Sequence, residues 1–243
     1  MAIERLVIVA DAHLGGVPAG VEAAFLEFLD AVPSLGDGLL INGDLFAFWF
    51  AYRRAIPREG VAVLVRLAAL ARTMPVAMTG GNHDRWGDGF WEQELGIRFS
   101  PDELRIPLAA GAALAVHGDG VAEARWHGRL LHSVFRHPVT SGIYRLLHPD
   151  VGFWLVDRLA GRLADSTRDP AELDAAASRQ RAWAEARLRA APELTLLVMG
   201  HTHRPALAEV TPGRWYLNPG AWMDGLCYAT ATGGKVELRR YRA

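Results

Sequence analysis

The sequence predicts a layered α/β fold, because strand patterns alternate with helical patterns through its first half. The run Leu6–Ala10 is wholly apolar and rich in β-branched residues, which is typical of a buried strand. Apolar residues recur at helical spacing at about 21–31 and again at about 60–72. We therefore expect a sheet with helices packed against it.

Four more apolar runs follow the first, at 39–41, 76–78, 114–116 and 196–199. All five runs end on residue types that bind metal ions in proteins. Folds of this class bind their ligands at the carboxyl ends of the strands. The sequence therefore predicts one site built from five strand ends: Asp11-Ala-His13, Asn42-Gly-Asp44, Gly80-Gly-Asn82-His83-Asp84, His117-Gly-Asp119 and Gly200-His201-Thr202-His203.

The segment at about 122–191 has no strand pattern and looks helical, with interruptions at Pro138, Pro149 and Pro170. We expect residues 1–243 to form a single domain in which this segment is an inserted helical cap. Shorter strand patterns after His203 would then complete the sheet, at 215–217, 226–230 and 236–240.

Composition limits the classes of function. The 243 residues are 51% hydrophobic and carry a net charge of -1, so the chain can form a packed core and has no overall attraction to nucleic acid. Cys227 is the single cysteine, which excludes an intramolecular disulfide and any multi-cysteine zinc site. The sequence shows neither a signal-peptide pattern nor an apolar run of about 20 residues. We expect a cytoplasmic protein whose contact with membranes is at most peripheral.

The residues at the strand ends suit a pair of divalent metal ions. Two such ions about 4 Å apart can hold a phosphoryl group and stabilise both the attacking and the leaving oxygen. A site of this kind needs oxygen and nitrogen ligands, one of them a carboxylate that contacts both ions. A ligand set without thiolate suits Mn, Fe or Zn. A pair of such ions held by these ligands predicts a hydrolase of phosphate esters or anhydrides. The candidate ligands are Asp11, His13, Asp44, Asn82, His117, His201 and His203.

These motifs, in this order, resemble those of the calcineurin-like metallophosphoesterase superfamily. The resemblance implies a four-layer sandwich, with two central β-sheets flanked by helices. It implies that Asp11, His13 and His203 hold one metal ion, that Asn82, His117 and His201 hold the other, and that Asp44 bridges them. It further implies that His83 contacts the phosphate and protonates the leaving oxygen, that Asp84 orients His83, and that the metal is Mn.

Other stretches are similar to the UDP-2,3-diacylglucosamine diphosphatases of lipid A synthesis, among them 25–29, 43–46, 200–205 and 220–222. That similarity implies cleavage of a UDP-linked diacyl sugar to UMP and 2,3-diacylglucosamine 1-phosphate at the cytoplasmic membrane surface. The candidate substrate contacts are Trp49, Arg158, Arg162 and Ser166.

Several alternatives stay open at this point. The metal site also suits a general phosphodiesterase, a nucleotide phosphatase or a phosphoprotein phosphatase, and the same fold could serve as a non-catalytic scaffold. The aromatic run at 45–54 and the arginines of the cap could be ordinary core packing and a solvated basic face. Alternatively, they could form a pocket or a membrane-surface patch for an anionic, acylated substrate. We expect structural roles for His127, His132, His137 and His148.

Overall fold

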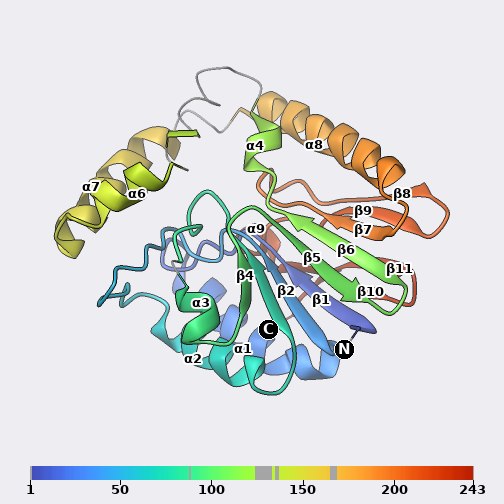
Figure 1. The fold of residues 1–243 in the computed structure, drawn as a ribbon, viewed down its shortest axis with the longest axis horizontal. Helices are drawn as coiled ribbons and strands as arrows, with labels where there is room; N and C mark the ends of the chain where they lie inside the picture. The colour runs from blue at the N-terminus through green and yellow to red at the C-terminus, as the bar shows by residue number, and fades with distance from the viewer. Residues whose placement is uncertain (1, 88, 124–132, 135–136, 165–168, 243) are drawn as a thin grey trace.

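The computed structural model describes residues 2–87, 89–123, 133–134, 137–164 and 169–242. Two β-sheets make up its centre (Figure 1). The first has the strand order β11-β10-β1-β2-β3-β4 and the second the order β5-β6-β7-β9-β8. The first-sheet strands are β1 (Arg5–Val9), β2 (Gly38–Asn42), β3 (Val76–Thr79), β4 (Arg98–Ser100), β10 (Cys227–Thr232) and β11 (Lys235–Arg240). The second-sheet strands are β5 (Glu103–Leu108), β6 (Gly111–Val116), β7 (Leu194–Val198), β8 (Ala206–Thr211) and β9 (Arg214–Asn218).

The apolar runs of the sequence form strands that are buried on both faces. In β1, Leu6 and Ile8 belong to the core between the two sheets, whereas Val7 and Val9 belong to the core beneath the helices. Neighbouring side chains of a strand point to opposite faces, so a strand covered on both sides must be apolar throughout. This requirement explains the continuous apolar run and confirms the strands predicted from it.

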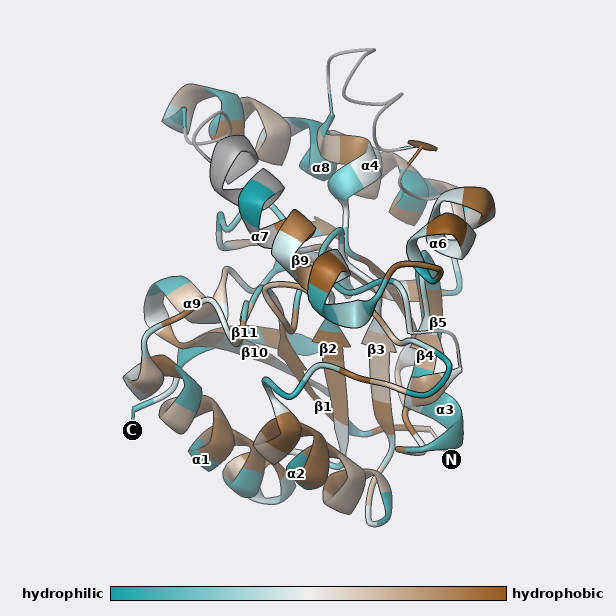
Figure 2. Ribbon diagram, turned by 90° about the vertical axis from the view of Figure 1, so that its left-hand side faces the viewer, coloured by the Kyte–Doolittle hydropathy of each residue, from teal (hydrophilic) through white to brown (hydrophobic). Residues whose placement is uncertain are grey.

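Helices cover the outer face of each sheet. The helices α1 (Ala19–Leu35) and α2 (Val61–Ala71) pack on the first sheet, and Figure 2 shows them lying below its strands. Helix α8 (Pro170–Ala190) packs on the second sheet through Ala184 and Leu188. The four layers predicted for the fold are therefore helix, sheet, sheet and helix. Short helices lie in the connections: α3 (Phe90–Gln93), α4 (Asp119–Ala122) and α9 (Trp222–Gly225).

The range predicted for the cap contains two kinds of helix. Helix α8 lies inside that range, yet it forms the outer layer of the second sheet. Helices α6 (Pro138–Tyr144) and α7 (Pro149–Ala164) lie away from α8 (Figure 1). Among the described residues, no helix combines the length and apolar character needed to cross a membrane.

Helices α6 and α7 contact the loop that follows β2 through aromatic rings. The centroid of Phe48 lies 6.0 Å from that of Tyr144 and 5.7 Å from that of Phe153. Phe50 lies 4.5 Å from Tyr144 by the same measure. We call the group the aromatic cluster; its members are Phe48, Phe50, Tyr52, Trp86, Tyr144 and Phe153.

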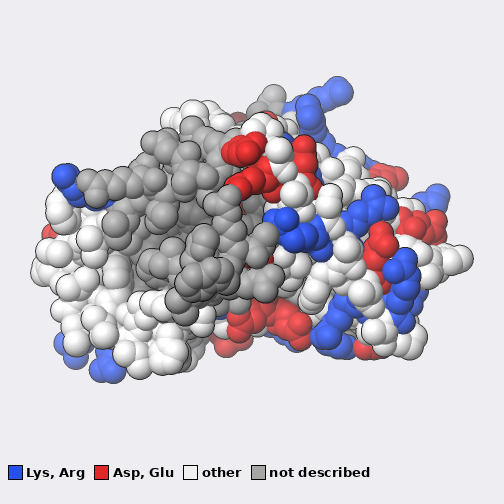
Figure 3. Space-filling model, turned by 90° about the horizontal axis from the view of Figure 1, so that it is seen from above, with Lys and Arg blue, Asp and Glu red and all other residues white. Residues whose placement is uncertain are grey.

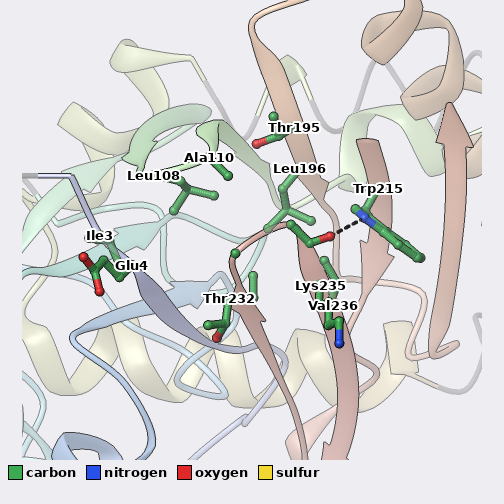
Figure 4. Close-up of a pocket in the computed structure, with 13 residues that line it drawn as sticks. Ile3, Glu4, Leu108, Ala110, Thr195, Leu196, Trp215, Thr232, Lys235 and Val236 are labelled. Atoms are coloured by element: carbon green, nitrogen blue, oxygen red, sulfur yellow. Dashed lines mark hydrogen bonds between the residues drawn. The ribbon is translucent and has the colours of Figure 1, made fainter. Parts of the chain in front are cut away.

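A small cavity lies at the edge of the sandwich where β1, β6 and β7 begin (Figure 4). It is lined by residues such as Ile3, Leu108 and Leu196, and Trp215 Nε1 donates a hydrogen bond of 2.9 Å to the carbonyl oxygen of Gly234 beside it. The candidate metal ligands follow the carboxyl ends of these strands. The cavity therefore lies at the opposite edge from the ligands and plays no part in the site.

Candidate metal centre

The five ligand loops meet at one edge of the sandwich. Strands β1, β2 and β3 run parallel, as do β6 and β7, so the loops that follow them leave each sheet at the same end. Backbone hydrogen bonds join the loops directly: the Asp11 amide donates to Gly43 (3.1 Å) and the His13 amide to Asp44 (3.0 Å). In the second sheet, the Gly200 amide donates to His117 (2.9 Å). The sequence-distant ligands are thus brought together by strand topology.

Two groups of side chains bring together ligand atoms that could hold metal ions. Ligand atoms of Asp11, His13 and His203 all lie within 4.8 Å of one another, and so do those of Asp44, His117 and His201. A third group of the same kind joins His13 and Asp44 to His83. Six of the predicted ligands are therefore clustered in two groups, and His83 lies beside both.

Asp44 and Asn82 lie between the histidines. Asp44 Oδ2 lies 3.2 Å from His117 Nε2 and 3.7 Å from His13 Nε2. Asn82 Oδ1 lies 3.3 Å from His117 Nε2 and 3.0 Å from His201 Nδ1. On the other side, His203 Nε2 lies 3.6 Å from Asp11 Oδ1. Asp44 therefore faces ligands of both sets, as a bridging carboxylate must.

One buried atom independently fits a bound cation. His13 Nε2 is buried and has no hydrogen-bond partner, although leaving such a nitrogen unsatisfied costs about 1–3 kcal/mol. Two glycines also pack closely against the ligand side chains. A Cβ atom on Gly81 would lie 2.0 Å from Asp44 Oδ1, and one on Gly43 would lie 2.3 Å from His117 Nδ1. The glycines that precede the ligands are thus required by close packing against them.

The ligand loops hold an unusual backbone conformation. Non-glycine residues seldom have positive φ, and each such residue costs on the order of 1–3 kcal/mol. Six of the described non-glycine residues have it, and five of these are candidate ligands. Strain concentrated at one set of side chains indicates that their direction matters to function. The five are Asp11 (52°), His13 (47°), Asp44 (51°), His201 (67°) and His203 (56°).

Two histidine rings are oriented by backbone carbonyls. His117 Nδ1 lies 3.0 Å from the carbonyl oxygen of Asn42, and His83 Nδ1 lies 2.6 Å from that of Ala47. A carbonyl oxygen only accepts hydrogen bonds, so Nδ1 carries the proton in both rings. In the neutral form of each ring, the lone pair of Nε2 therefore faces the site. Metal-binding histidines show the same arrangement.

The role predicted for Asp84 differs from the contacts that its side chain makes. Its carboxylate accepts hydrogen bonds from the amides of Asp44 (3.2 Å), Leu45 (2.6 Å) and Gly81 (2.8 Å). The His83 ring instead bonds to Ala47, while the His83 amide donates to Asp44 Oδ1 (2.9 Å). Asp84 therefore fixes the loop that carries Asp44 and acts on His83 only through that loop.

Burial and neighbouring charges set the protonation of the metal-free site. Burial lowers the pKa of His13 to about 3 and that of His201 to about 4, so both rings are neutral and ready to bind metal. Burial raises the pKa of Asp11 to about 6. Burial alone would lower the pKa of His117, but the charge and hydrogen bond of Asp44, together with the charges of Asp11 and Asp119, outweigh burial and raise that pKa well above its usual value. For Asp44, the charges of His117 and His83 outweigh burial and hold its pKa well below the usual range.

These shifts predict how metal binding depends on pH. Metal must displace the proton of His117 at neutral pH, and below about pH 6 it must also displace that of Asp11. Metal affinity should therefore fall as the pH falls, and the number of protons released should rise from about one to about two on crossing pH 6. Calorimetric titration in buffers of different ionisation enthalpy measures this number. A constant proton release between pH 5 and pH 7.5 would contradict the prediction.

The four predicted substrate contacts do not lie together in the described part of the structure. Trp49 is fully buried, stacks on Phe46 and packs at a tilt against Trp91, with centroids 4.8 and 5.2 Å away, as the alternative of core packing requires. Arg158 is exposed on α7, with its guanidinium 5.7 Å from the centroid of the Trp154 ring. Arg162 lies in α7, but its side chain is outside what the structure describes; Ser166 lies outside the described residues.

The sequence patterns did not predict Asp224, which contacts a candidate ligand. Asp224, on α9, lies 2.9 Å from His203 Nδ1 through its Oδ2. It follows no apolar run of the kind that ends on the other site residues, and 21 positions separate it from His203. The only hint of its proximity is that the chain returns to the first sheet just after it, at β10.

Comparison with known proteins agrees with this geometry. The family model described as calcineurin-like phosphoesterase matches residues 4–205. A UDP-2,3-diacylglucosamine hydrolase of Escherichia coli O7:K1 is 26% identical over 239 residues, covering 95% of this chain and 96% of that protein. The enzyme of the same name from Bordetella parapertussis is 29% identical over 203 residues, covering 82% and 77%. For the one from Porphyromonas gingivalis, identity is 28% over 153 residues, covering 60% and 58%.

Solved structures align with the chain over nearly its whole length, though loosely. Vacuolar Protein Sorting 29 from Cryptosporidium parvum aligns with a TM-score of 0.46 at 14% identity, covering 98% of this chain and 97% of that one. YfcE, a phosphoesterase from E. coli, aligns with a TM-score of 0.44 at 18% identity, covering 94% and 88%. From the family match over most of its length, the chain belongs to the calcineurin-like phosphoesterases, a family of metal-dependent phosphoester hydrolases.

Proposed function

We propose that this phosphoester hydrolase cleaves the diphosphate of UDP-2,3-diacylglucosamine to give UMP and 2,3-diacylglucosamine 1-phosphate. The observation that carries the proposal is the continuity between the ligand loops and an apolar, aromatic surface. The loop that starts at Asp44 contributes Phe48, Phe50 and Tyr52 to the aromatic cluster, which reaches α6 and α7. A substrate with a charged diphosphate and long acyl chains matches this pairing of surfaces.

The metal ions would be held by the two clustered ligand sets. Asp11, His13 and His203 would hold one ion and Asn82, His117 and His201 the other, with Asp44 between them. Two bound divalent ions would lower the pKa of a water molecule and neutralise charge on the phosphoryl oxygens. Mn is the first choice for that pair, with Fe or Zn as alternatives.

His83 would act on the leaving group. Its ring packs edge-on against that of His13, with centroids 4.8 Å apart, and its Nδ1–H bonds to Ala47. In its imidazolium form the ring would donate the Nε2 proton to the departing oxygen and keep the Nδ1 proton on Ala47. The ring is only partly buried, so the position of the proton donor is compatible with access by a substrate.

The surface beyond the aromatic cluster suits acyl chains and a membrane face. Figure 3 shows charged residues gathered over the end of the molecule that α8 occupies, while the described surface toward α6 and α7 is mainly uncharged. A large exposed apolar surface marks a site of interaction with lipid or protein. The exposed apolar residues of this region are Val139, Ile143, Leu146, Val151, Trp154 and Leu155. We place the enzyme at the cytoplasmic surface of the membrane.

The names of the relatives support the same substrate. The proteins from E. coli O7:K1 and Bordetella parapertussis are named UDP-2,3-diacylglucosamine hydrolase, and the chain aligns with most of the length of each. Arg158, exposed on α7 and in contact with Trp154, is a candidate to bind the anionic part of the substrate. Arg162 and Ser166, farther along the chain, are candidates for the same role.

The test compares two substrates with the Mn-loaded protein. UDP-2,3-diacylglucosamine is presented in detergent micelles, and bis(4-nitrophenyl) phosphate serves as the general phosphodiester. We expect kcat/KM for the lipid substrate to exceed that for the general one by at least about 10²-fold, because binding energy from the acyl chains and the uridine contributes only with the former. Equal and slow turnover of both would overturn the assignment and favour a general phosphodiesterase.

A further inference from the structure

Two outer side chains support the metal ligands from elements that the ligand motifs do not include. Asp224 contacts His203, and Gln180 contacts the loops of His117 and His201. These contacts belong to different ligand sets. We propose that Asp224 and Gln180 are positioning residues, one for each metal position, so that the two positions can be weakened separately. The inference rests on the two-metal site of the proposed function and is independent of the substrate.

Helix α9, which carries Asp224, is held by backbone hydrogen bonds and by aromatic packing. The backbone amides of Trp222 and Met223 donate to Ala10 (3.0 Å) and Asp11 (3.2 Å), so α9 is bonded to the loop that carries a ligand. The Trp222 ring is fully buried, with centroids 5.2 Å from Phe25 and 4.8 Å from Phe28. The position of Asp224 is therefore fixed relative to Asp11 before any metal binds.

The contact between Asp224 and His203 determines which ring nitrogen faces the metal. A carboxylate oxygen only accepts, so the 2.9 Å contact places the proton on His203 Nδ1. The lone pair of Nε2 is then directed to the side of Asp11 Oδ1, 3.6 Å away. Since the side chains of His203 and Asp224 are 27% and 55% exposed, water weakens the contact as a source of stability. Its effect should therefore appear in the orientation of the ring rather than in the fold.

Gln180 supports the other ligand set from inside the protein. Its side chain is fully buried on α8. The amide nitrogen donates to the carbonyl oxygens of Gly118 and Gly200, both at 3.2 Å, and the amide oxygen accepts from the Thr202 hydroxyl at 3.3 Å. Gly118 follows His117, and Gly200 and Thr202 flank His201. One side-chain amide thus joins two ligand loops of the second sheet.

The contact between Gln180 and the His117 loop requires a glycine at position 118. A Cβ atom on Gly118 would lie 2.4 Å from Gln180 Nε2. Asn218 strengthens the same junction, because its side-chain nitrogen donates to Gly200 and to the Thr202 hydroxyl, each at 3.1 Å. Partners of metal ligands of this kind typically change metal affinity by about 10–100-fold when removed.

The experiment measures Mn²⁺ binding by calorimetry, without substrate. We expect Asp224→Ala to weaken one of the two equivalents by about 10–100-fold and to leave the other unchanged. Asp224→Asn should recover most of the affinity, because its amide oxygen still accepts from Nδ1–H. Gln180→Met should weaken the other equivalent to a similar degree, and the combined variant should weaken both.

Matched controls separate positioning from general damage. Asp30→Ala removes an exposed carboxylate that bonds to Arg66 at the surface, and Leu188→Met alters a buried side chain of α8 that bears no polar group. Both should bind two equivalents as the parent does. Thermal unfolding of the metal-free proteins should show Asp224→Ala unchanged. If Gln180→Met does not fold, Thr202→Val removes one of the same contacts and should weaken the same equivalent.

Three results would overturn the inference. They are unchanged binding in Asp224→Ala, binding in Asp224→Asn as weak as in Asp224→Ala, and a combined variant in which one equivalent stays tight. Because no substrate is used, failure to cleave UDP-2,3-diacylglucosamine would leave a positive binding result intact. The two proposals therefore fail separately.

Discussion

Replacing Asp44 should remove most of the bound metal and nearly all activity. The carboxylate faces His117 at 3.2 Å and His13 at 3.7 Å, so its loss weakens both metal positions at once. Metal ions contribute several kcal/mol of transition-state stabilisation, and about 4 kcal/mol corresponds to a factor of about 10³. We expect Asp44→Ala to lower kcat/KM by at least about 10³-fold. Elemental analysis of the dialysed protein should find less than one metal ion per chain.

Asp44→Asn is the sharper form of this test. The asparagine keeps an oxygen that can accept the His83 amide hydrogen bond, which Asp44 Oδ1 accepts at 2.9 Å, but it lacks the charge that a bridging ligand needs. The Asp30→Ala variant, which loses an exposed carboxylate elsewhere, should retain two metal ions and full activity. A full complement of metal in the Asp44 variants would refute the bridging role.

Replacing His83 should separate catalysis from metal binding. His83 borders the ligand sets, but its Nδ1 is bonded to Ala47, and the two predicted sets are complete without it. We expect His83→Ala to retain two metal ions and to lower kcat by about 10²–10⁴-fold, the range typical of a lost general acid. Metal content and steady-state kinetics, measured on the same preparation, test both halves of the prediction.

The leaving group provides the control for this prediction. A nitrophenolate departs as an anion and needs little protonation, so the loss in His83→Ala should be smaller with bis(4-nitrophenyl) phosphate than with an ester of a simple alcohol. Equal losses with both esters would show that His83 acts on the phosphoryl group rather than on the leaving oxygen. Loss of metal in this variant would instead assign the residue to the metal centre.

The layered fold and the clustering of ligands could be predicted because both depend on local patterns. A strand buried on both faces must be apolar along its whole length, which makes β1, β2 and β3 visible in the sequence. Strands β5 and β8 were not predicted, since one face of each is solvated and their patterns are shorter and more polar. The ligands follow the strands directly, so the strand prediction also located them.

The surfaces covered by the helices at about 122–191 could not be predicted from the same patterns. Helix α8 has a mainly polar sequence, like many exposed helices, and only a few residues such as Gln180, Ala184 and Leu188 face the second sheet. A helical pattern does not say which surface the helix covers. The packing of α8 on the sheet, and of α6 and α7 on the aromatic cluster, depends on contacts between distant segments.

Candidate ligands for two metal ions could be named before the fold was known, because ligand chemistry depends on residue type and on position after a strand. How these side chains are held depends on tertiary contacts. The carbonyls of Asn42 and Ala47, the carboxylates of Asp84 and Asp224, and the amide of Gln180 come from segments far from the groups that they contact. A hydrogen bond between distant segments leaves no periodicity in the sequence, so the residues that position the ligands appear only once the chain is folded.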